Sequence, residues 1–284
     1  MKTQVHDLAA RRYSCRDYTD RPLEDAAREA LTAALATLDT GPLGNRCRFA
    51  LLAATQDDRA ALKGLGTYGF IKGATGFIVG AVRPGPGDME DYGYLLERAV
   101  LEATELELGT CWLGGTFNKS SFARKIDVRK DEVMPAVVAT GYPTEDSRKH
   151  WLRSRIGAER RLPAEQLFFE GSPATQMPPD TADGATRVLE VVRWAPSASN
   201  KQPWRVVRDG TNWHFYLART PGYRGGVLKS LVKLADLQRV DIGIAMCHFE
   251  LAAREAGLGG HWAVAQPGID VSAAGWEYEV SWIG

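Results

Sequence analysis

Arg12, Ser14 and Arg16 place two guanidinium groups and a hydroxyl within five residues, in the run RRYSCR at 11–16. Guanidinium forks and a serine hydroxyl suit a phosphate, because together they supply several charge-assisted hydrogen bonds in a fixed geometry. The run follows a short predicted helix and precedes a second one that begins near residue 23. Solvated basic residues at a helix end would explain it equally well, so support is needed from another segment.

A second polar segment, APSASNKQPW at residues 195–204, combines two serines, an asparagine and a glutamine between two prolines. Short hydrogen-bonding side chains beside proline favour defined turns, and binding groups are often carried on such loops. We therefore predict a binding turn that leads into a strand.

Other chemistries find little support in the residue pattern. The five histidines are dispersed and form no nucleophilic triad, and His248 on an apolar helix is more simply interpreted as a core histidine. The four cysteines lack C-x-x-C spacing and a nearby histidine, so we expect reduced thiols and no metal site. Residues 64–69 match G-x-G-x-x-G, but a helical pattern precedes the glycines and a strand-like one follows, the reverse of a dinucleotide-binding motif.

The chain contains an internal repeat. Residues 91–112 and 241–262 match at eight of 22 positions with an offset of 150, including Gly93 with Gly243 and Trp112 with Trp262. Both segments have apolar residues at helical spacing, and both reach a Leu-Gly pair where we expect a left-handed residue. Each is predicted to be a long, largely buried helix that runs into a tryptophan-bearing turn. Coincidence between two amphipathic helices is the alternative.

A weaker repeat relates GPLGNRCRF at 41–49 to PSASNKQPW at 196–204. Residues 171–184 (GSPATQMPPDTADG) have the composition of a connector. We therefore expect two halves, 1–170 and 171–284.

Short strands of mixed pattern favour an α+β sandwich over a doubly wound sheet. In the first half the pattern predicts helices at 3–12, 23–39, 57–63, 91–108 and 119–126, and strands at 48–54, 75–82 and 134–141. In the second half it predicts helices at 183–195, 224–232 and 236–257, and strands at 204–208, 212–218, 261–265 and 276–283.

The composition indicates a small-molecule partner. Thirty-five basic residues balance thirty-five acidic ones, so no long-range field favours nucleic acid or an anionic membrane. No apolar run has the length of a signal peptide or a membrane span, so a cytoplasmic protein is expected.

The ordered set of motifs resembles the nitroreductase superfamily of FMN-dependent oxidoreductases. The matching segments are an R-x-S-x-R motif (Arg12, Ser14, Arg16), a G-L-G-x-x-W-like turn (Leu108–Gly115), G-Y-P (Gly141–Pro143), a basic R-x-P-type element (Arg160–Pro163) and P-S-x-x-N-x-Q-P-W (Pro196–Trp204). The resemblance covers nearly the whole chain and implies a nitroreductase-like α/β sandwich.

Most members of that superfamily are homodimers with flavins at the subunit interface. Here the arginine motif lies in the first half and the PSASNKQPW turn in the second, as in the single-chain tandem branch of the superfamily. The resemblance therefore implies an intramolecular pseudo-dimer, monomeric overall, with one FMN per chain. The C-terminal arm that embraces the partner subunit in family members has no evident match, because this chain ends in strand-like YEVSWIG.

The resemblance also assigns roles to individual residues. Arg12, Ser14, Arg16 and Arg161 would hold the phosphate and ribityl end. Trp112, Leu113, Gly114 and Gly115 would lie along the ring, with the glycine backbone near flavin N5 and O4. The residues expected to contact the flavin from the second half are Pro196, Ser197, Ser199 and Asn200. No side chain is expected to act as a nucleophile.

The activity that the resemblance implies is hydride transfer from NAD(P)H, as a transient reductant, to a nitroaromatic, quinone or similar flat acceptor. Two alternatives stay open. The chain could be a flavin-binding protein with little turnover, used for sensing or storage, or a flavin-dependent dehydrogenase of another metabolite.

Overall fold

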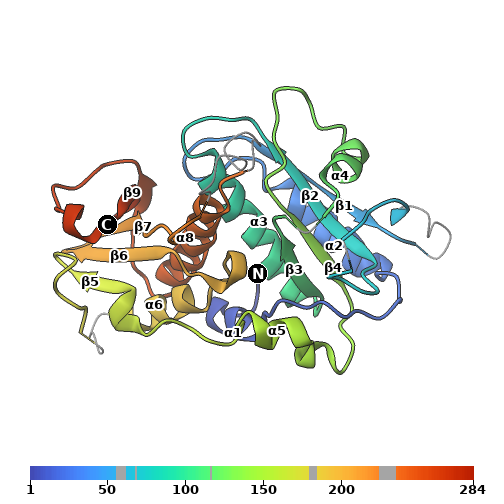
Figure 1. Cartoon of the computed structure of the whole chain (residues 1–284), viewed down its shortest axis with the longest axis horizontal. Coiled ribbons are helices and arrows are strands. Elements are labelled where there is room, and N and C mark those ends of the chain that lie inside the picture. The colour runs from blue at the N-terminus through green and yellow to red at the C-terminus, as the bar shows by residue number, and fades with distance from the viewer. Residues whose placement is uncertain (56–61, 68, 116, 179–183, 224–234) are drawn as a thin grey trace.

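Two mixed α/β halves lie on either side of a central pair of helices in the computed structural model (Figure 1). The structure describes residues 1–55, 62–67, 69–115, 117–178, 184–223 and 235–284. The predicted helices at 57–63 and 224–232 fall largely or wholly outside these residues. The α+β class predicted from the sequence is confirmed.

The first sheet has the order β1-β2-β4-β3 and is antiparallel throughout. Its strands are β1 (Cys47–Ala53), β2 (Gly76–Val82), β3 (Gly109–Leu113) and β4 (Val137–Gly141). Residues of β2 alternate between two cores: Ile78 and Val82 face helices α2 (Asp25–Ala36) and α3 (Asp88–Glu105), whereas Phe77 and Val79 face α4 (Lys119–Lys125). Because helices cover both faces, every residue of β2 is buried.

The second sheet has the order β5-β6-β7-β9-β8. Its strands are β5 (Phe168–Glu170), β6 (Trp204–Asp209), β7 (Asn212–Leu217), β8 (His261–Ala263) and β9 (Glu277–Ile283). Without β5, the order β6-β7-β9-β8 repeats that of the first sheet, strand for strand. Helices α6 (Ala185–Trp194) and α8 (Leu237–Glu255) cover one face.

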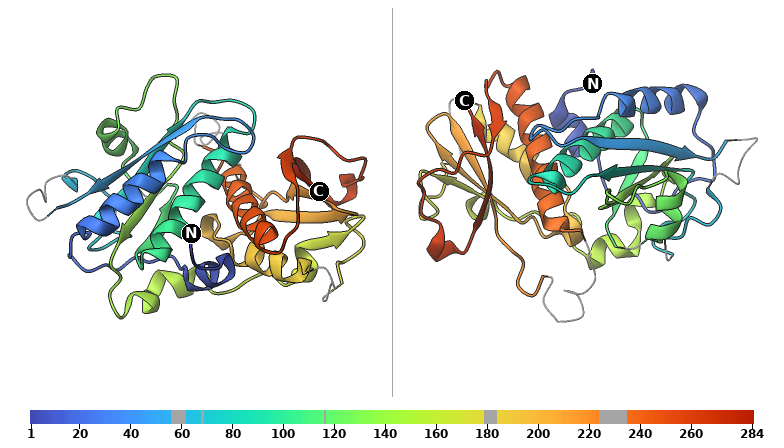
Figure 2. Two further views of the ribbon diagram at one scale, coloured as in Figure 1. Left: turned by 180° about the vertical axis from the view of Figure 1, so that it is seen from behind. Right: turned by 90° about the horizontal axis from the view of Figure 1, so that it is seen from above.

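Helices α3 and α8 run side by side at the centre of the molecule (Figure 2). A Cβ atom on Gly93 would overlap the carbonyl of Val240, and one on Gly243 would overlap the carbonyl of Glu90. The two contacts are reciprocal, because Gly93 pairs with Gly243 and Glu90 with Val240 at the repeat offset of 150. The backbones can approach this closely only where neither helix carries a side chain. As a result, one hydrophobic core includes residues of both halves.

The ends of the two helices correct one prediction from the sequence. The left-handed residues are Glu107 (φ 61°) and Gly257 (φ 75°), which precede the Leu-Gly pairs instead of lying within them. In both copies the leucine N–H forms the last hydrogen bond at the C-terminus of the helix. Leu108 N–H donates to Ala103 O at 2.9 Å, and Leu258 N–H donates to Ala253 O at 2.8 Å.

Three further elements were not predicted. Residues 109–113, expected to be a turn, form β3 and pair with β4. A short helix that was not predicted, α5 (Trp151–Arg155), follows the first sheet. The helix predicted at 3–12 is present as α1 (Val5–Arg11). β5, at the end of the first half, pairs in parallel with β6 of the second half. One segment therefore does reach the other half, although the sequence showed no match to the C-terminal arm of family members.

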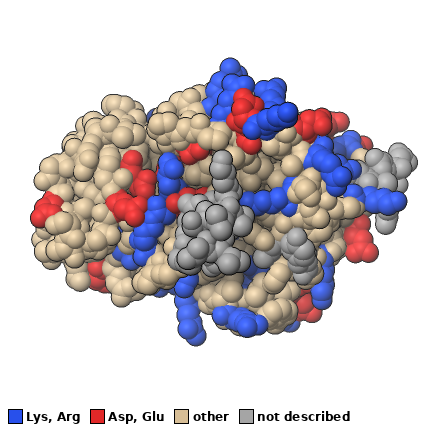
Figure 3. Space-filling model, turned by 45° about the horizontal axis from the view of Figure 1, so that its top comes forward, with Lys and Arg blue, Asp and Glu red and all other residues tan. Residues whose placement is uncertain are grey.

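Surface charge is mixed over the face shown in Figure 3, where basic and acidic side chains both occur on the two halves. No helix among the described residues is long and apolar enough to cross a membrane.

We predict that Gly243→Ala lowers the free energy of unfolding by about 3 kcal/mol, because the added methyl group would meet the backbone of α3 and force the helices apart. Urea unfolding followed by tryptophan fluorescence measures this change. The matched control is Gly259→Ala, where an added Cβ would meet nothing within 4 Å, with an expected change below about 0.5 kcal/mol. Equal stability of the two variants would contradict the close crossing.

Candidate functional site

A cavity of about 620 Å³ lies between the two halves, within the size range of small-molecule sites. It is bounded by the residues after α1, the end of β3, the α5 segment, the loop at 196–200 and the start of α8. All twelve residues predicted from the sequence line this cavity: Arg12, Ser14, Arg16, Trp112, Leu113, Gly114, Gly115, Arg161, Pro196, Ser197, Ser199 and Asn200. Their contact with a flavin stays a prediction.

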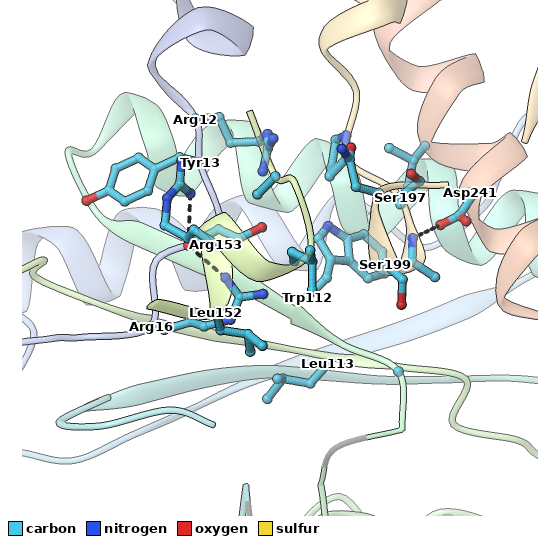
Figure 4. A pocket seen from close by; sticks show the side chains of 18 of the residues that line it. Arg12, Tyr13, Arg16, Trp112, Leu113, Leu152, Arg153, Ser197, Ser199 and Asp241 are labelled. Atoms are coloured by element: carbon cyan, nitrogen blue, oxygen red, sulfur yellow. Dashed lines mark hydrogen bonds between the residues drawn. The ribbon is translucent and has the colours of Figure 1, made fainter. Parts of the chain in front are cut away.

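The cavity has two chemically different ends (Figure 4). Arg12, Tyr13, Arg16 and Arg153 gather at one end, whereas Ser197, Ser199 and Asp241 lie at the other, with Trp112 and Leu113 between them. The chain is extended after α1, and a β-bridge pairs Ser14 with Thr110 of β3. Within residues 12–16 the segment runs along the cavity, and Cys15, which is buried in the core, is the one residue that does not line it.

Positive charge exceeds negative charge in the cavity wall. Five arginines line it, against two carboxylates, Glu159 and Asp241. Several of these guanidinium groups donate to neutral carbonyls: both Arg16 and Arg153 donate to Ser14 O at 3.3 Å. Burial, with Arg12, Arg193 and Arg153 nearby, lowers the pKa of Arg161 to about 10. Arg153 also pairs with Glu159 at 3.2 Å, and the remaining excess of cations favours a bound anion.

The loop at 196–200 is held in an unusual backbone conformation. Ser199 (φ 50°) and Asn200 (φ 55°) are both left-handed, although neither is glycine. Asp241 Oδ1 accepts the Ala198 N–H at 2.9 Å, and Ser197 Oγ accepts the Gln202 N–H at 2.8 Å. These contacts fix the serines beside the cavity.

Asn200 connects the two halves. Its Oδ1 accepts a hydrogen bond from Arg161 Nη1 at 2.8 Å, and its Nδ2 donates to the carbonyls of Gly157 and Arg160 at 2.6 and 2.7 Å. The side chain therefore orients Arg161 and the segment that carries it.

The end of β3 forms the wall between the two ends of the cavity. Trp112 Nε1 donates to Glu97 Oε2 at 2.8 Å, which fixes the indole ring. A Cβ atom on Gly114 would overlap the side chain of Leu237, so glycine allows the start of α8 to pack here. A Cβ atom on Gly115 would meet nothing within 4 Å. The space beside the Gly115 backbone is thus open.

Sequence reasoning missed several residues of the cavity. Arg153, which is 5% exposed, joins the arginine end from α5, whose existence was not predicted. Asp241 entered the sequence analysis only as the first residue of the repeated segment 241–262, where it matches Asp91. The basic run at 148–161 was the one sequence signal near Arg153, and nothing in that run distinguishes this arginine from the others. His248 does not line the cavity and is fully buried, as interpreted from the sequence.

Asp91 and Asp241 occupy equivalent positions of the repeat but have different surroundings. Asp91 accepts N–H groups of Leu43 at 2.8 Å and of Asn45 at 2.8 and 2.9 Å. Asp241 accepts one N–H, and its Oδ2 has no partner among the described residues. Burial raises the pKa of both carboxyl groups, and raises that of Asp241 well above its usual value.

Comparison with known proteins identifies related sequences and folds. A model of the family described as "Putative TM nitroreductase" matches residues 4–253. A structure described as a putative nitroreductase from Thermotoga maritima has 18% identity and a TM-score of 0.61, with 100% of this chain and 94% of that chain covered. The comparison with curated proteins finds no match.

Two more distant structures are similar to about half of the chain. A putative nitroreductase in complex with FMN from Desulfovibrio desulfuricans has 23% identity and a TM-score of 0.40, with 52% of this chain and 90% of that chain covered. An FMN- and NADPH-dependent nitroreductase from Sphigopyxis sp. strain HMH has 15% identity and a TM-score of 0.39, with coverages of 51% and 91%.

We predict that Asp91→Asn lowers the free energy of unfolding at neutral pH by about 2 kcal/mol, because its amide group would face N–H donors. Asp241→Asn is the matched control. The amide oxygen of the new asparagine can still accept the hydrogen bond from the Ala198 N–H, and its NH₂ group takes the place of Oδ2, which has no partner among the described residues. We therefore expect the free energy of unfolding to fall by less than about 1 kcal/mol. Urea unfolding of both variants measures the difference, and a larger loss for Asp241→Asn would contradict the assigned contacts.

Proposed function

Because this chain belongs to the family described as putative TM nitroreductases, we propose that it is an oxidoreductase that binds one FMN in the cavity between its halves. The observation that carries the proposal is the polarity of that cavity. Arginines gather at one end, and Trp112, Leu113 and the serines of the polar turn lie beyond them. This arrangement suits a ligand with an anionic group at one end and a flat, hydrogen-bonding ring at the other.

The residues present fit such a group. Arg12, Ser14, Arg16 and Arg161 would bind the phosphate and ribityl end, and we add Arg153 to this set because it is buried among them. The segment from Trp112 to Gly115 would lie against the ring, with the glycine backbone near N5 and O4. Pro196, Ser197, Ser199 and Asn200 would close the site from the second half, with Asn200 acting mainly by orienting Arg161.

The halves are proposed to be tandem units, 1–170 and 171–284, that form an intramolecular pseudo-dimer and a monomer overall. The repeated strand order and the reciprocal glycine contacts of α3 and α8 support this interpretation. β5 belongs to the first unit by sequence and to the second by pairing. One FMN per chain follows, because the loop at 41–45 lacks the serines of its counterpart and residues 171–184 contain no arginine motif.

FMN supplies hydride transfer when bound, and the protein supplies binding, orientation and electrostatics. NADH or NADPH is the proposed reductant, and a nitroaromatic, quinone or similar flat small molecule is the proposed acceptor. Arginines around the anionic end would hold the cofactor while substrates exchange.

We expect the purified chain, after incubation with FMN and gel filtration, to retain one flavin per chain, seen as a flavin absorbance band. The loaded protein should oxidise NADH or NADPH when a quinone or nitroaromatic acceptor is added. A protein that retains no FMN would contradict the proposal. Retention without NAD(P)H oxidation would support one of the two alternatives, a flavin-binding protein with little turnover or a flavin-dependent dehydrogenase of another metabolite.

Arg12→Ala and Asn200→Ala are each predicted to weaken FMN binding by about tenfold or more, although the two residues lie in opposite halves. Arg12→Ala removes a charged phosphate contact, and Asn200→Ala releases Arg161. The matched controls are Arg11→Ala and Lys201→Ala, neighbouring residues that do not line the cavity. Fluorescence titration measures the affinities, and normal FMN binding by both site variants would disprove the shared site.

A further inference from the structure

A buried ionisable pair lies behind the cavity wall. Glu97 of α3 and His248 of α8 both have 0% exposure. Glu97 Oε1 is 2.9 Å from His248 Nε2 and 3.9 Å from Arg12 Nε, while Glu97 Oε2 accepts the indole N–H of Trp112. Glu97 therefore contacts one residue of the second half, His248, and two first-half residues of the candidate site, Arg12 and Trp112.

The surroundings of His248 determine where its protons are. Nδ1 is 2.9 Å from the carbonyl oxygen of Val191 on α6. A carbonyl oxygen only accepts hydrogen bonds, so Nδ1 must carry a proton. Nε2 faces a carboxyl oxygen at a similar distance, and this contact also needs a proton between its two atoms.

Two proton arrangements satisfy both contacts. In one, an imidazolium cation faces a carboxylate; in the other, a neutral imidazole accepts the proton of a carboxylic acid. The net charge of the pair is zero in each. A neutral imidazole beside an ionised Glu97 would set two lone pairs against each other, which burial makes costly.

This neutrality matters for Arg12. Glu97 is the one carboxylate within 4.0 Å of the Arg12 guanidinium in the described part of the chain. Arg12 Nε has no hydrogen-bond partner there, and burial is the largest cause that lowers the pKa of Arg12. An ionised Glu97 without His248 would become the counter-ion of Arg12 and compete with any anion in the cavity.

The symmetry-related positions of the repeat lack this pair. At the repeat offset, Cys247 corresponds to Glu97 and Arg98 to His248. Trp262 instead donates to Glu250 Oε2 at 2.8 Å, and Glu250 contacts Arg254 at 2.7 Å. Of the two related sets of repeat positions, the one beside the arginine motif thus carries the glutamate–histidine pair.

We propose that Glu97 and His248 share one proton and form a neutral pair, so that Arg12 keeps its full positive charge for the phosphate of a bound flavin. His248 is a positioning residue that acts through Glu97. The proposal rests on the proposed FMN site and extends it, because it makes the preference for FMN over riboflavin depend on a residue outside the cavity.

Nitrogen NMR of the histidine-labelled full chain without flavin tests the proton directly. We expect His248, assigned by the signal that disappears in His248→Gln, to carry a proton at Nδ1 and to show a second proton between Nε2 and Glu97 at neutral pH. A His248 with its Nδ1 proton alone, and none between Nε2 and Glu97, would overturn the proposal, whatever the protein binds.

Titration with FMN and riboflavin tests the consequence for Arg12. In His248→Gln the glutamine can donate to Glu97 but carries no charge, so Glu97 ionises against Arg12. We expect FMN affinity to fall about tenfold with riboflavin affinity unchanged. Glu97→Gln leaves a neutral group at this position and should keep the wild-type ratio of the two affinities.

The double variant Glu97→Gln/His248→Gln separates charge from packing. Removing the carboxylate should restore the wild-type ratio of FMN to riboflavin affinity, whereas a merely structural role predicts equal losses for both ligands. A double variant that stays as weak for FMN as His248→Gln would overturn the proposal. Wild-type protein that binds FMN no more tightly than riboflavin would instead disprove the phosphate site itself.

Discussion

The close crossing of α3 and α8 is the constraint on which the rest of the structure depends. Gly93 and Gly243 let each helix backbone touch the other, and this contact fixes the distance between the two sheets. Polar contacts then span the same junction: Arg239 donates to Glu90 at 2.6 and 2.7 Å, Tyr94 donates to Glu250 at 2.8 Å, and Glu97 meets His248. Because the cavity is built from both halves, its geometry is set by this crossing.

Patterns that depend on local geometry could be predicted from the sequence. The spacing of apolar residues located α3 and α8, and their shared glycines and tryptophans exposed the repeat. The run from Arg12 to Arg16 carries the residue types that suit an anion, and the structure places all of it except Cys15 along the cavity. The resemblance to a family predicted that this motif and the loop at 196–200 form one site. No local sequence pattern could predict that the two segments lie together.

Features that exist only through tertiary contact could not be predicted. β3 and β5 have five and three residues and are strands because β4 and β6 pair with them. Glu107 takes the left-handed position that the Leu-Gly pair was expected to hold, since the closing bond is made by Leu108. The sequence around Arg153 does not distinguish it from other arginines nearby. It lines the cavity because α5, which carries it, packs there.

The two loops that follow α2 and α6 show how a repeated frame produces one site instead of two. Asn45 turns inward and donates to Asp91, whereas Asn200 turns outward and donates to Gly157 and Arg160. That outward turn leaves Asp241 with an oxygen that has no partner in the described chain, a loss of about 1–3 kcal/mol for a buried group. The same turn brings the asparagine to Arg161 and the serines to the cavity. The second half therefore gives up a local hydrogen bond that the first half keeps, and the bond is lost where the cavity is built.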